Sequence, residues 1–204
     1  MKKIICYGDS NTFGFNPKDA SRFDENTRWT SVLQKILGEE YEIINEGMCD
    51  RTGFADNPNG FLFCASKHFP KFIKMPEAID YLILWIGTND LMSQYDISFE
   101  TIEKGLENLI TLAQSKTGEI IIIPPVILSD NILKGYFADR FDKTSIDKST
   151  KVGEIYKKLS NIHNCKFFDV NVFVKPSEID GLHYNEFSHK IIAEKLAQLF
   201  LDVI

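Results

Sequence analysis

Short apolar runs that alternate with helical patterns are the feature that most constrains the fold of this chain. The runs have the length and composition of buried strands, and they cover residues 3–7, 42–45, 81–86, 119–123 and 165–169. Strands separated by helices predict right-handed crossovers and a parallel sheet with helices on both faces. We therefore predict an α/β fold, a three-layer α/β/α arrangement around a central, mostly five-stranded parallel sheet. Because the sequence has no internal repeat or linker, we expect residues 1–204 to form a single domain.

The first apolar run ends abruptly in a turn of small residues, Gly8-Asp9-Ser10-Asn11-Thr12. The carboxyl end of the first strand lies at the functional edge of an α/β sheet. If a helix follows, its first amides and its positive dipole end face the Ser10 hydroxyl. Ser10 is therefore a candidate nucleophile. Turn residues of this kind are common, so this stretch taken alone also fits a turn that only redirects the chain.

A carboxylate and an imidazole stand three residues apart in Asp180-Gly181-Leu182-His183. On a helical turn this spacing places both side chains on one face. Asp180 could then accept the Nδ1 proton of His183, fix its tautomer and stabilise the imidazolium. His183 would serve as the base for Ser10. An isolated pair of this type also fits a surface turn, but the chain order Ser, Asp, His favours a catalytic triad.

A second buried run, residues 81–86, ends in Gly87-Thr88-Asn89-Asp90. The side-chain amide of Asn89 is a suitable donor to a developing oxyanion, or a cap for the following turn. Taken in order, Gly-Asp-Ser, Gly-Thr-Asn-Asp and Asp-Gly-Leu-His resemble the motif blocks of the SGNH hydrolases, also called GDSL esterases. Arg28-Trp29-Thr30, the segment 45–52 and Ile121-Ile122-Ile123-Pro124-Pro125 resemble the arylesterase and acyltransferase branch of that superfamily.

The resemblance implies a flavodoxin-like SGNH fold and a serine esterase that hydrolyses short-chain acetyl or aryl esters through an acyl-Ser10 intermediate. Transfer of the acyl group to an alcohol is a variant of the same chemistry. The oxyanion hole would consist of the amides of Ser10 and Asp50 and the side chain of Asn89. The residues expected in supporting roles are Asp9, Gly87 and Asp90. The family chemistry needs no metal and no organic cofactor, and relatives of this branch lead us to expect a homo-oligomer.

Two positions depart from the family pattern. Asn11 stands where the GDSL name has leucine, and Asp50 falls where the second block typically has glycine. A carboxylate 4 Å from a developing negative charge opposes it by about 4 kcal/mol at an effective dielectric near 20. We therefore expect the Asp50 side chain to point away from the oxyanion, or to pair with Arg51 or another cation. A positive φ at this position would add strain, because the residue is not glycine.

Two aromatic-rich loops, residues 13–29 and 53–74, suit either an acyl or aryl pocket or ordinary packing. The pocket candidates are Phe13 and Trp29 from the first loop, and Arg51, which comes just before the second. The segment 128–147 is polar with isolated aromatics, and it is a candidate lid.

The composition bounds the other functions. The net charge of −6, with no basic run, argues against a nucleic-acid partner and against an anionic membrane surface. No apolar segment approaches the length that spans a bilayer, and Lys2-Lys3 leads directly into the first strand without a signal peptide. We therefore expect a cytoplasmic enzyme with a small-molecule ester substrate. The four cysteines lack metal-ligand spacing, so we expect no metal site.

Two alternatives stay open. A carbohydrate O-deacetylase would use the same triad on a sugar ester. A flavodoxin-like module would instead bind a phosphate through Ser10 and Thr12, with Trp29 or Trp85 stacked on a flavin. Asp9 argues against the second alternative, because an acid beside the loop would repel a phosphate.

Overall fold

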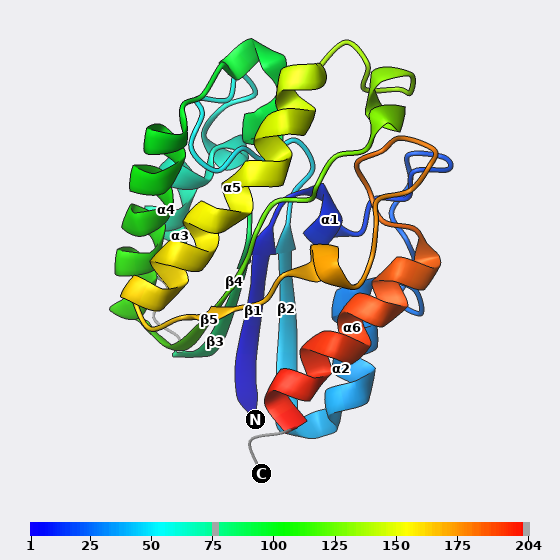
Figure 1. The fold of residues 1–204 in the computed structure, drawn as a ribbon. Helices are drawn as coiled ribbons and strands as arrows, with labels where there is room; N and C mark the ends of the chain where they lie inside the picture. The colour runs from blue at the N-terminus through cyan, green and yellow to red at the C-terminus, as the bar shows by residue number, and fades with distance from the viewer. Residues whose placement is uncertain (75–77, 202–204) are drawn as a thin grey trace.

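The computed structural model describes residues 1–74 and 78–201, which contain a parallel sheet of five strands (Figure 1). The strand order is β2-β1-β3-β4-β5, and every neighbouring pair is parallel. The strands are β1 (Lys2–Gly8), β2 (Tyr41–Gly47), β3 (Ile79–Trp85), β4 (Thr117–Ile123) and β5 (Lys166–Phe167). The predicted α/β class and the five-stranded parallel sheet are therefore confirmed.

Strand β5 is shorter than predicted, because only two of its residues pair with β4. The other strands extend slightly beyond their predicted amino-terminal ends. Strand β1 pairs with β2 on one edge and β3 on the other, helix residues pack on both of its faces, and residues 4–8 are buried. Burial on both faces explains why this strand is continuously apolar rather than alternating.

Helices cover both faces of the sheet (Figure 1). On one face, α2 (Trp29–Leu37) and α6 (Glu186–Leu201) pack against each other. On the other face lie α3 (Ala65–Phe72), α4 (Phe99–Gln114) and α5 (Lys143–Ile162). The remaining helix, α1 (Ser10–Phe13), follows β1 directly. Short 3₁₀ turns occupy Gly38–Glu40, Phe61–Phe63, Asn89–Leu91, Ser93–Tyr95, Asp130–Leu133 and Val170–Val172.

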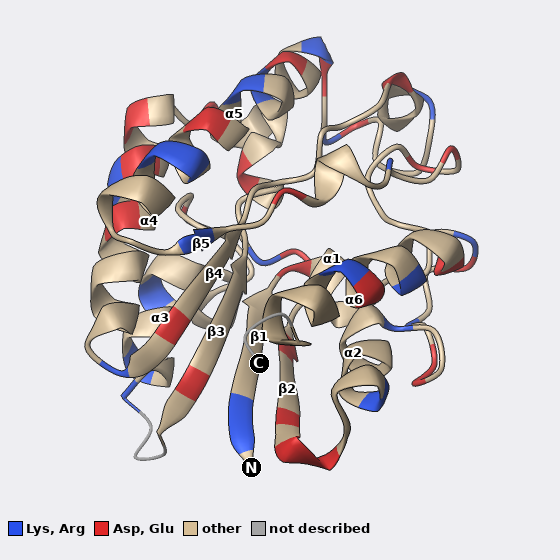
Figure 2. Ribbon diagram, turned by 60° about the horizontal axis from the view of Figure 1, so that its bottom comes forward, with Lys and Arg blue, Asp and Glu red and all other residues tan. Residues whose placement is uncertain are grey.

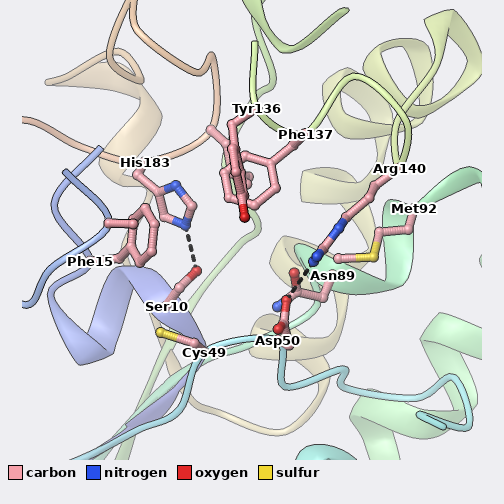
Figure 3. A pocket seen from close by; sticks show the side chains of 12 residues that line it. Ser10, Phe15, Cys49, Asp50, Asn89, Met92, Tyr136, Phe137, Arg140 and His183 are labelled. Carbon is pink, nitrogen blue, oxygen red and sulfur yellow. Dashed lines mark hydrogen bonds and ion pairs between the residues drawn. The ribbon is translucent and has the colours of Figure 1, made fainter. Parts of the chain in front are cut away.

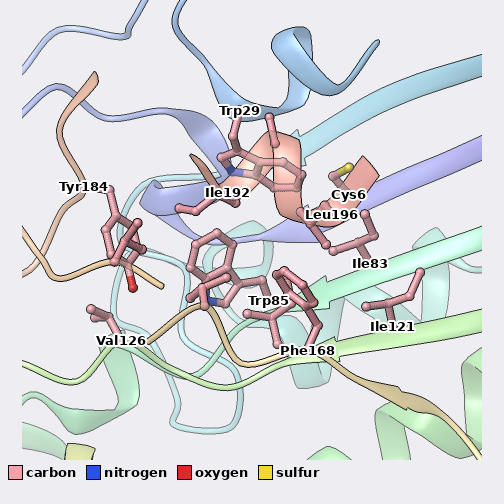
Figure 4. Packing of buried hydrophobic residues seen from close by; sticks show 14 of the residues in the cluster. Cys6, Trp29, Ile83, Trp85, Ile121, Val126, Phe168, Tyr184, Ile192 and Leu196 are labelled. Carbon is pink, nitrogen blue, oxygen red and sulfur yellow. The ribbon is translucent and has the colours of Figure 1, made fainter. Parts of the chain in front are cut away.

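The alternating sides of the strands build two separate apolar layers. Cys6 and Trp85 face the layer that α6 covers, whereas Tyr7 and Leu84 face the layer that α4 covers. Trp29 is fully buried in the first layer, with its ring centroid 6.0 Å from that of Trp85 (Figure 4). The Nε1–H of Trp29 donates to the carbonyl of Asn11 at 3.0 Å, which satisfies its polar atom inside this layer.

Charged residues of both signs are interspersed along α4 and α5 (Figure 2). Ion pairs such as Lys158 to Glu103, at 2.6 Å, connect these two helices on their exposed sides. Among the described residues, no helix has the length and apolar character that a membrane span requires.

Candidate active site

Ser10 is presented by the sharp turn from β1 into α1. The Asp9 side chain caps α1, because its Oδ1 accepts the amide N–H of Asn11 at 3.0 Å. Gly8 is required at this turn, since a Cβ there would overlap the Thr12 side chain and the carbonyl of Trp85. Ser10 is therefore the first residue of α1 and lies at the carboxyl end of β1.

His183 is carried by a loop that closes on itself through Asp180. The Oδ1 atom of Asp180 accepts the amide N–H groups of Leu182 and His183, each at 3.0 Å. The segment is a turn followed by a bend, with Gly181 at φ +70°, so the predicted helical turn is wrong. The positive φ breaks the helical path, and the side chain of Asp180 replaces the helical backbone bonds.

Ser10, His183 and Asp180 form one continuous hydrogen-bonded chain (Figure 3 shows its serine and histidine). His183 Nε2 lies 2.8 Å from Ser10 Oγ, and His183 Nδ1 lies 2.6 Å from Asp180 Oδ2. A carboxylate can only accept, so Nδ1 carries a proton and Nε2 is left to accept the serine proton. This is the arrangement that general-base activation of a serine requires.

The chain of three residues is almost completely buried, with exposed fractions of 7% for Ser10 and 2% each for Asp180 and His183. Burial alone would raise the pKa of Asp180, but the hydrogen bond and charge of His183 hold that pKa below its ordinary value. The rings of Phe15 and Phe137 lie 4.2 and 5.4 Å from the imidazole. These rings restrict the orientation of His183 and keep water from its face.

Asn89 and Asp50 lie beside Ser10, as the oxyanion prediction requires (Figure 3). Asn89 begins the 3₁₀ turn after β3, and its Nδ2 donates to the carbonyl of Arg51 at 2.9 Å. Because Nδ2 carries two protons, one remains for an oxyanion. Asp50 has φ +60°, the strained conformation that a glycine adopts more easily. Its carboxylate pairs with Arg140, at 2.9 Å, and not with Arg51.

The segment that follows Asp50 is anchored by Asp90. This buried carboxylate accepts the amide N–H groups of Gly53 at 2.5 Å, and of Phe54 and Ala55 at 2.7 Å each. Gly87 is the other tightly constrained position, because it has φ +116° and a Cβ there would overlap the hydroxyl of Tyr156. The backbone geometry around Asn89 and Asp50 therefore depends on groups outside the pocket.

A pocket of about 180 Å³ opens beside Ser10 (Figure 3). Its lining residues are Ser10, Phe15, Ala20, Cys49, Asp50, Asn89, Met92, Tyr136, Phe137, Arg140, Leu182 and His183. Phe15, Tyr136, Phe137 and Arg140 are among the lining residues that the prediction did not name as pocket or site residues. The sequence did contain a signal for them, since they belong to the aromatic-rich loop 13–29 and the candidate lid 128–147.

The three predicted pocket residues do not line this pocket, so their assignment is wrong. Trp29 belongs to the core, as described above. Phe13 packs against the guanidinium of Arg22, 4.4 Å from its ring centroid. Arg51 is 2% exposed, lies over the ring of Tyr7 and donates to backbone carbonyls, including that of Gly8 at 3.0 Å. Each of these side chains is occupied by local packing or backbone hydrogen bonds.

Cys49 also lines the pocket, but it is a poor nucleophile. Burial, together with the charges of Asp50 and Asp9, raises the pKa of its thiol to about 11. Among residues 1–74 and 78–201, no cluster of three or more His, Cys, Asp or Glu side chains is arranged to hold a metal ion.

Comparison with protein families matches residues 6–191 to the GDSL-like lipase/acylhydrolase family. The chain belongs to this family. The match spans all three motif blocks, and the predicted superfamily and ester-hydrolysing activity are thereby confirmed. An enzyme of this family is supported over the phosphate- or flavin-binding module that the first turn left open.

Several solved structures of esterases resemble this GDSL-like acylhydrolase over its whole length. A carbohydrate acetylesterase family member from Sinorhizobium meliloti is 26% identical, with a TM-score of 0.89, and the alignment covers 98% of this chain and 97% of that one. The inhibitor-bound aryl esterase of M. smegmatis is 25% identical, with a TM-score of 0.89 and full coverage of both chains. Est24, a carbohydrate acetylesterase from Sinorhizobium meliloti, is 25% identical, with a TM-score of 0.83 and full coverage of both. Comparison with curated protein sequences gave no significant match.

Proposed function

We propose that this acylhydrolase is a serine esterase that hydrolyses short-chain acyl esters, acetyl or aryl, through an acyl-Ser10 intermediate. The observation that carries the proposal is the hydrogen-bonded chain from Ser10 Oγ through His183 to Asp180, with distances of 2.8 and 2.6 Å. Because the Asp180 carboxylate accepts the Nδ1 proton of His183, Nε2 is free to accept the proton of Ser10. A pocket beside the serine supplies space for the ester.

The reaction begins when His183 Nε2 removes the Ser10 proton as Oγ attacks the ester carbonyl carbon. The carbonyl π electrons move to oxygen, and Asp180 stabilises the imidazolium that forms. The oxyanion accepts hydrogen bonds from the amides of Ser10 and Asp50 and from the Asn89 side chain. The tetrahedral intermediate then collapses, and His183 gives its proton to the departing alcohol.

Deacylation repeats these steps with water in place of the serine. His183 removes a proton from water, hydroxide adds to the acyl carbon, and Ser10 Oγ leaves with the proton from His183. An alcohol that replaces water at this stage gives acyl transfer. Phe15 and Phe137 pack around the imidazole, with ring centroids 4.2 and 5.4 Å from that of His183.

The first experiment compares p-nitrophenyl acetate hydrolysis by the wild-type protein with that of Ser10→Ala and His183→Ala. We expect both variants to lose at least about a thousandfold in kcat, because the two side chains act as one unit. Ser115→Ala, at an exposed serine at the end of α4, is the matched control and should keep wild-type activity. Circular dichroism checks that each variant folds. Full activity in either site variant would contradict the proposal.

A fluorophosphonate probe gives a second readout that does not depend on the natural substrate. It should add one adduct mass to Ser10 in the wild-type protein, and none in Ser10→Ala. Labelling at another residue, with activity retained, would identify a different nucleophile.

Carbohydrate O-deacetylation is the second candidate function, and one observation favours it. A polar hollow of about 270 Å³ adjoins the pocket, separated from it by the Asp50 and Arg140 side chains. The additional polar residues along it include Asn57, Asn59 and Gln94. Amide and charged groups of this kind suit a sugar hydroxyl. Turnover of acetylated xylose, compared with that of p-nitrophenyl acetate, distinguishes the candidates through their kcat/KM values.

A further inference from the structure

Asp50 places a negative charge at a point where the proposed reaction creates another. Its amide has no acceptor among the described residues, and in the proposed mechanism this amide donates to the oxyanion. Its side chain lines the same pocket as Ser10, and 41% of that side chain is exposed. A carboxylate that turned toward the oxyanion would raise the energy of the transition state more than that of the bound ester.

Arg140 forms an ion pair with the Asp50 carboxylate. Its Nη1 donates to Asp50 Oδ1 at 2.9 Å, and both side chains lie at the edge of the pocket opposite His183 (Figure 3). The guanidinium carbon is 5.5 Å from the ring centroid of Phe137, which supports it from one side. The pair joins two segments that are 90 positions apart in the sequence.

The backbone of Arg140 is fixed independently of Asp50. Its carbonyl accepts the amide N–H of Ser93 at 2.9 Å and the hydroxyl of the same serine at 3.1 Å. Its own amide donates to the carbonyl of Phe137 at 2.9 Å. The backbone at Arg140 is therefore fixed before a substrate binds, and the Phe137 ring contacts the guanidinium, which together lower the entropic cost of keeping the ion pair formed.

Arg51, the other cation near Asp50 in sequence, is not available for this task. It is buried among backbone carbonyls and lies over the Tyr7 ring. Arg140 is thus positioned to direct the Asp50 carboxylate toward the mouth of the pocket and to balance its charge.

We propose that Arg140 is a positioning residue that acts through Asp50: it holds the carboxylate away from the oxyanion, so that a residue other than glycine can serve as a backbone donor there. This inference rests on the proposed esterase function. It assigns Arg140 no contact with the reacting atoms. Its effect is electrostatic, so it depends on the charge at position 50.

A double-mutant cycle with p-nitrophenyl acetate tests this dependence, because the neutral substrate gives an arginine no anion to recognise. We expect Arg140→Gln to lower kcat about 10- to 100-fold with little change in KM. Asp50→Asn removes the charge and keeps the backbone donor, so it is the reference background for the double variant. The double variant Arg140→Gln/Asp50→Asn should have a kcat within about threefold of that of Asp50→Asn, since removal of the carboxylate removes the need for its partner.

Asp50→Gly gives a second background, in which the positive φ is relieved and the carboxylate is absent. There, Arg140→Gln should change kcat less than threefold. Lys134→Gln is the matched control, because it removes an exposed positive charge from the same segment, and Lys134 is in none of the ion pairs of the described residues. It should leave kcat unchanged. In Arg140→Gln, added salt should restore part of the lost kcat by screening Asp50.

Two outcomes overturn the inference. One is wild-type kcat in Arg140→Gln, and the other is a loss that neither Asp50→Asn nor Asp50→Gly restores. Both outcomes count only when Ser10→Ala abolishes the wild-type activity in the same assay. An activity that survives Ser10→Ala contradicts the proposed function itself, so the two failures are distinguishable.

Discussion

Replacement of the buried His189 should make the protein less sensitive to acid. This histidine is fully buried in α6, and its Nδ1 accepts the amide N–H of Trp29 at 3.2 Å. The second nitrogen, Nε2, therefore carries the proton of the neutral ring. Protonation would place a new N–H against the Trp29 donor and leave a charge in an apolar layer beside Phe23. Burial accordingly lowers the pKa of His189 to about 3.

The sign of the pH effect follows from this lowered pKa. An unfolded histidine has a pKa near 6.5, so between about pH 6.5 and 3 the unfolded state binds more protons than the native state. The stability that His189 contributes is complete above about pH 6.5 and is lost as the pH falls. At about 1.4 kcal/mol per pH unit, the loss at pH 5 amounts to about 2 kcal/mol. That is a large share of a typical unfolding free energy of about 5–15 kcal/mol.

The substitution His189→Asn isolates this contribution. The Oδ1 of asparagine can take the place of Nδ1 as the acceptor for Trp29, and asparagine does not titrate. Urea unfolding at pH 7.5 and pH 5.0 should show that the wild-type protein loses about 2 kcal/mol more than the variant between these two conditions. The quantity to compare is the pH-dependent loss of unfolding free energy in one protein relative to the other. Burial raises the pKa of Asp9 and of Asp90 to about 6, so these two groups oppose the effect of His189 equally in both proteins.

Cavity formation lowers the stability of His189→Asn at both pH values and so cancels in the comparison. Equal losses of unfolding free energy between pH 7.5 and pH 5.0 in His189→Asn and the wild-type protein would contradict a lowered pKa of His189.

Three further substitutions give separate tests. Asp180→Asn should leave a folded protein whose kcat on p-nitrophenyl acetate falls roughly 10³- to 10⁴-fold, because the amide no longer enforces the productive tautomer. Asn11→Leu should lower kcat several-fold and lower the free energy of urea unfolding by about 1–3 kcal/mol. It leaves the Leu182 carbonyl and the Tyr184 amide without their hydrogen-bond partner. Gly87→Ala should cost at least about 2 kcal/mol in the same assay, because its φ of +116° does not suit an alanine. Unchanged values in any of the three would contradict the corresponding contact.

The core of the sheet could be predicted from the sequence because most residues of its three inner strands, β1, β3 and β4, are buried. Such strands read as continuous apolar runs, and each predicted run lies on an observed strand. The position of the site followed from the same pattern. Ser10 comes directly after β1, and Asn89 comes shortly after β3. Since β1 and β3 are neighbouring parallel strands, their carboxyl ends meet at one edge of the sheet.

The pocket could not be predicted in the same way. An aromatic-rich loop indicates that rings are buried nearby, but not which ring faces the substrate. That choice depends on partners distant in sequence. Trp29 lies in the core, where its indole N–H donates to the Asn11 carbonyl, whereas Phe15 packs on His183. The helical turn expected around Asp180 failed for a local reason, because Gly181 takes a positive φ that the spacing alone does not reveal.

The two departures from the family motifs are both accommodated by residues far away in the chain. The Asn11 side chain contacts the loop that carries His183 on both sides of that histidine. Its Oδ1 lies 3.3 Å from the Tyr184 amide nitrogen, and its Nδ2 lies 3.5 Å from the Leu182 carbonyl oxygen. A leucine could make neither bond. Asp50 is likewise matched by Arg140 and not by a neighbour in its own block. A motif position can therefore change chemically when a distant group supplies the missing partner. It follows that exchanging Arg140 alone should cost more than exchanging Arg140 together with Asp50.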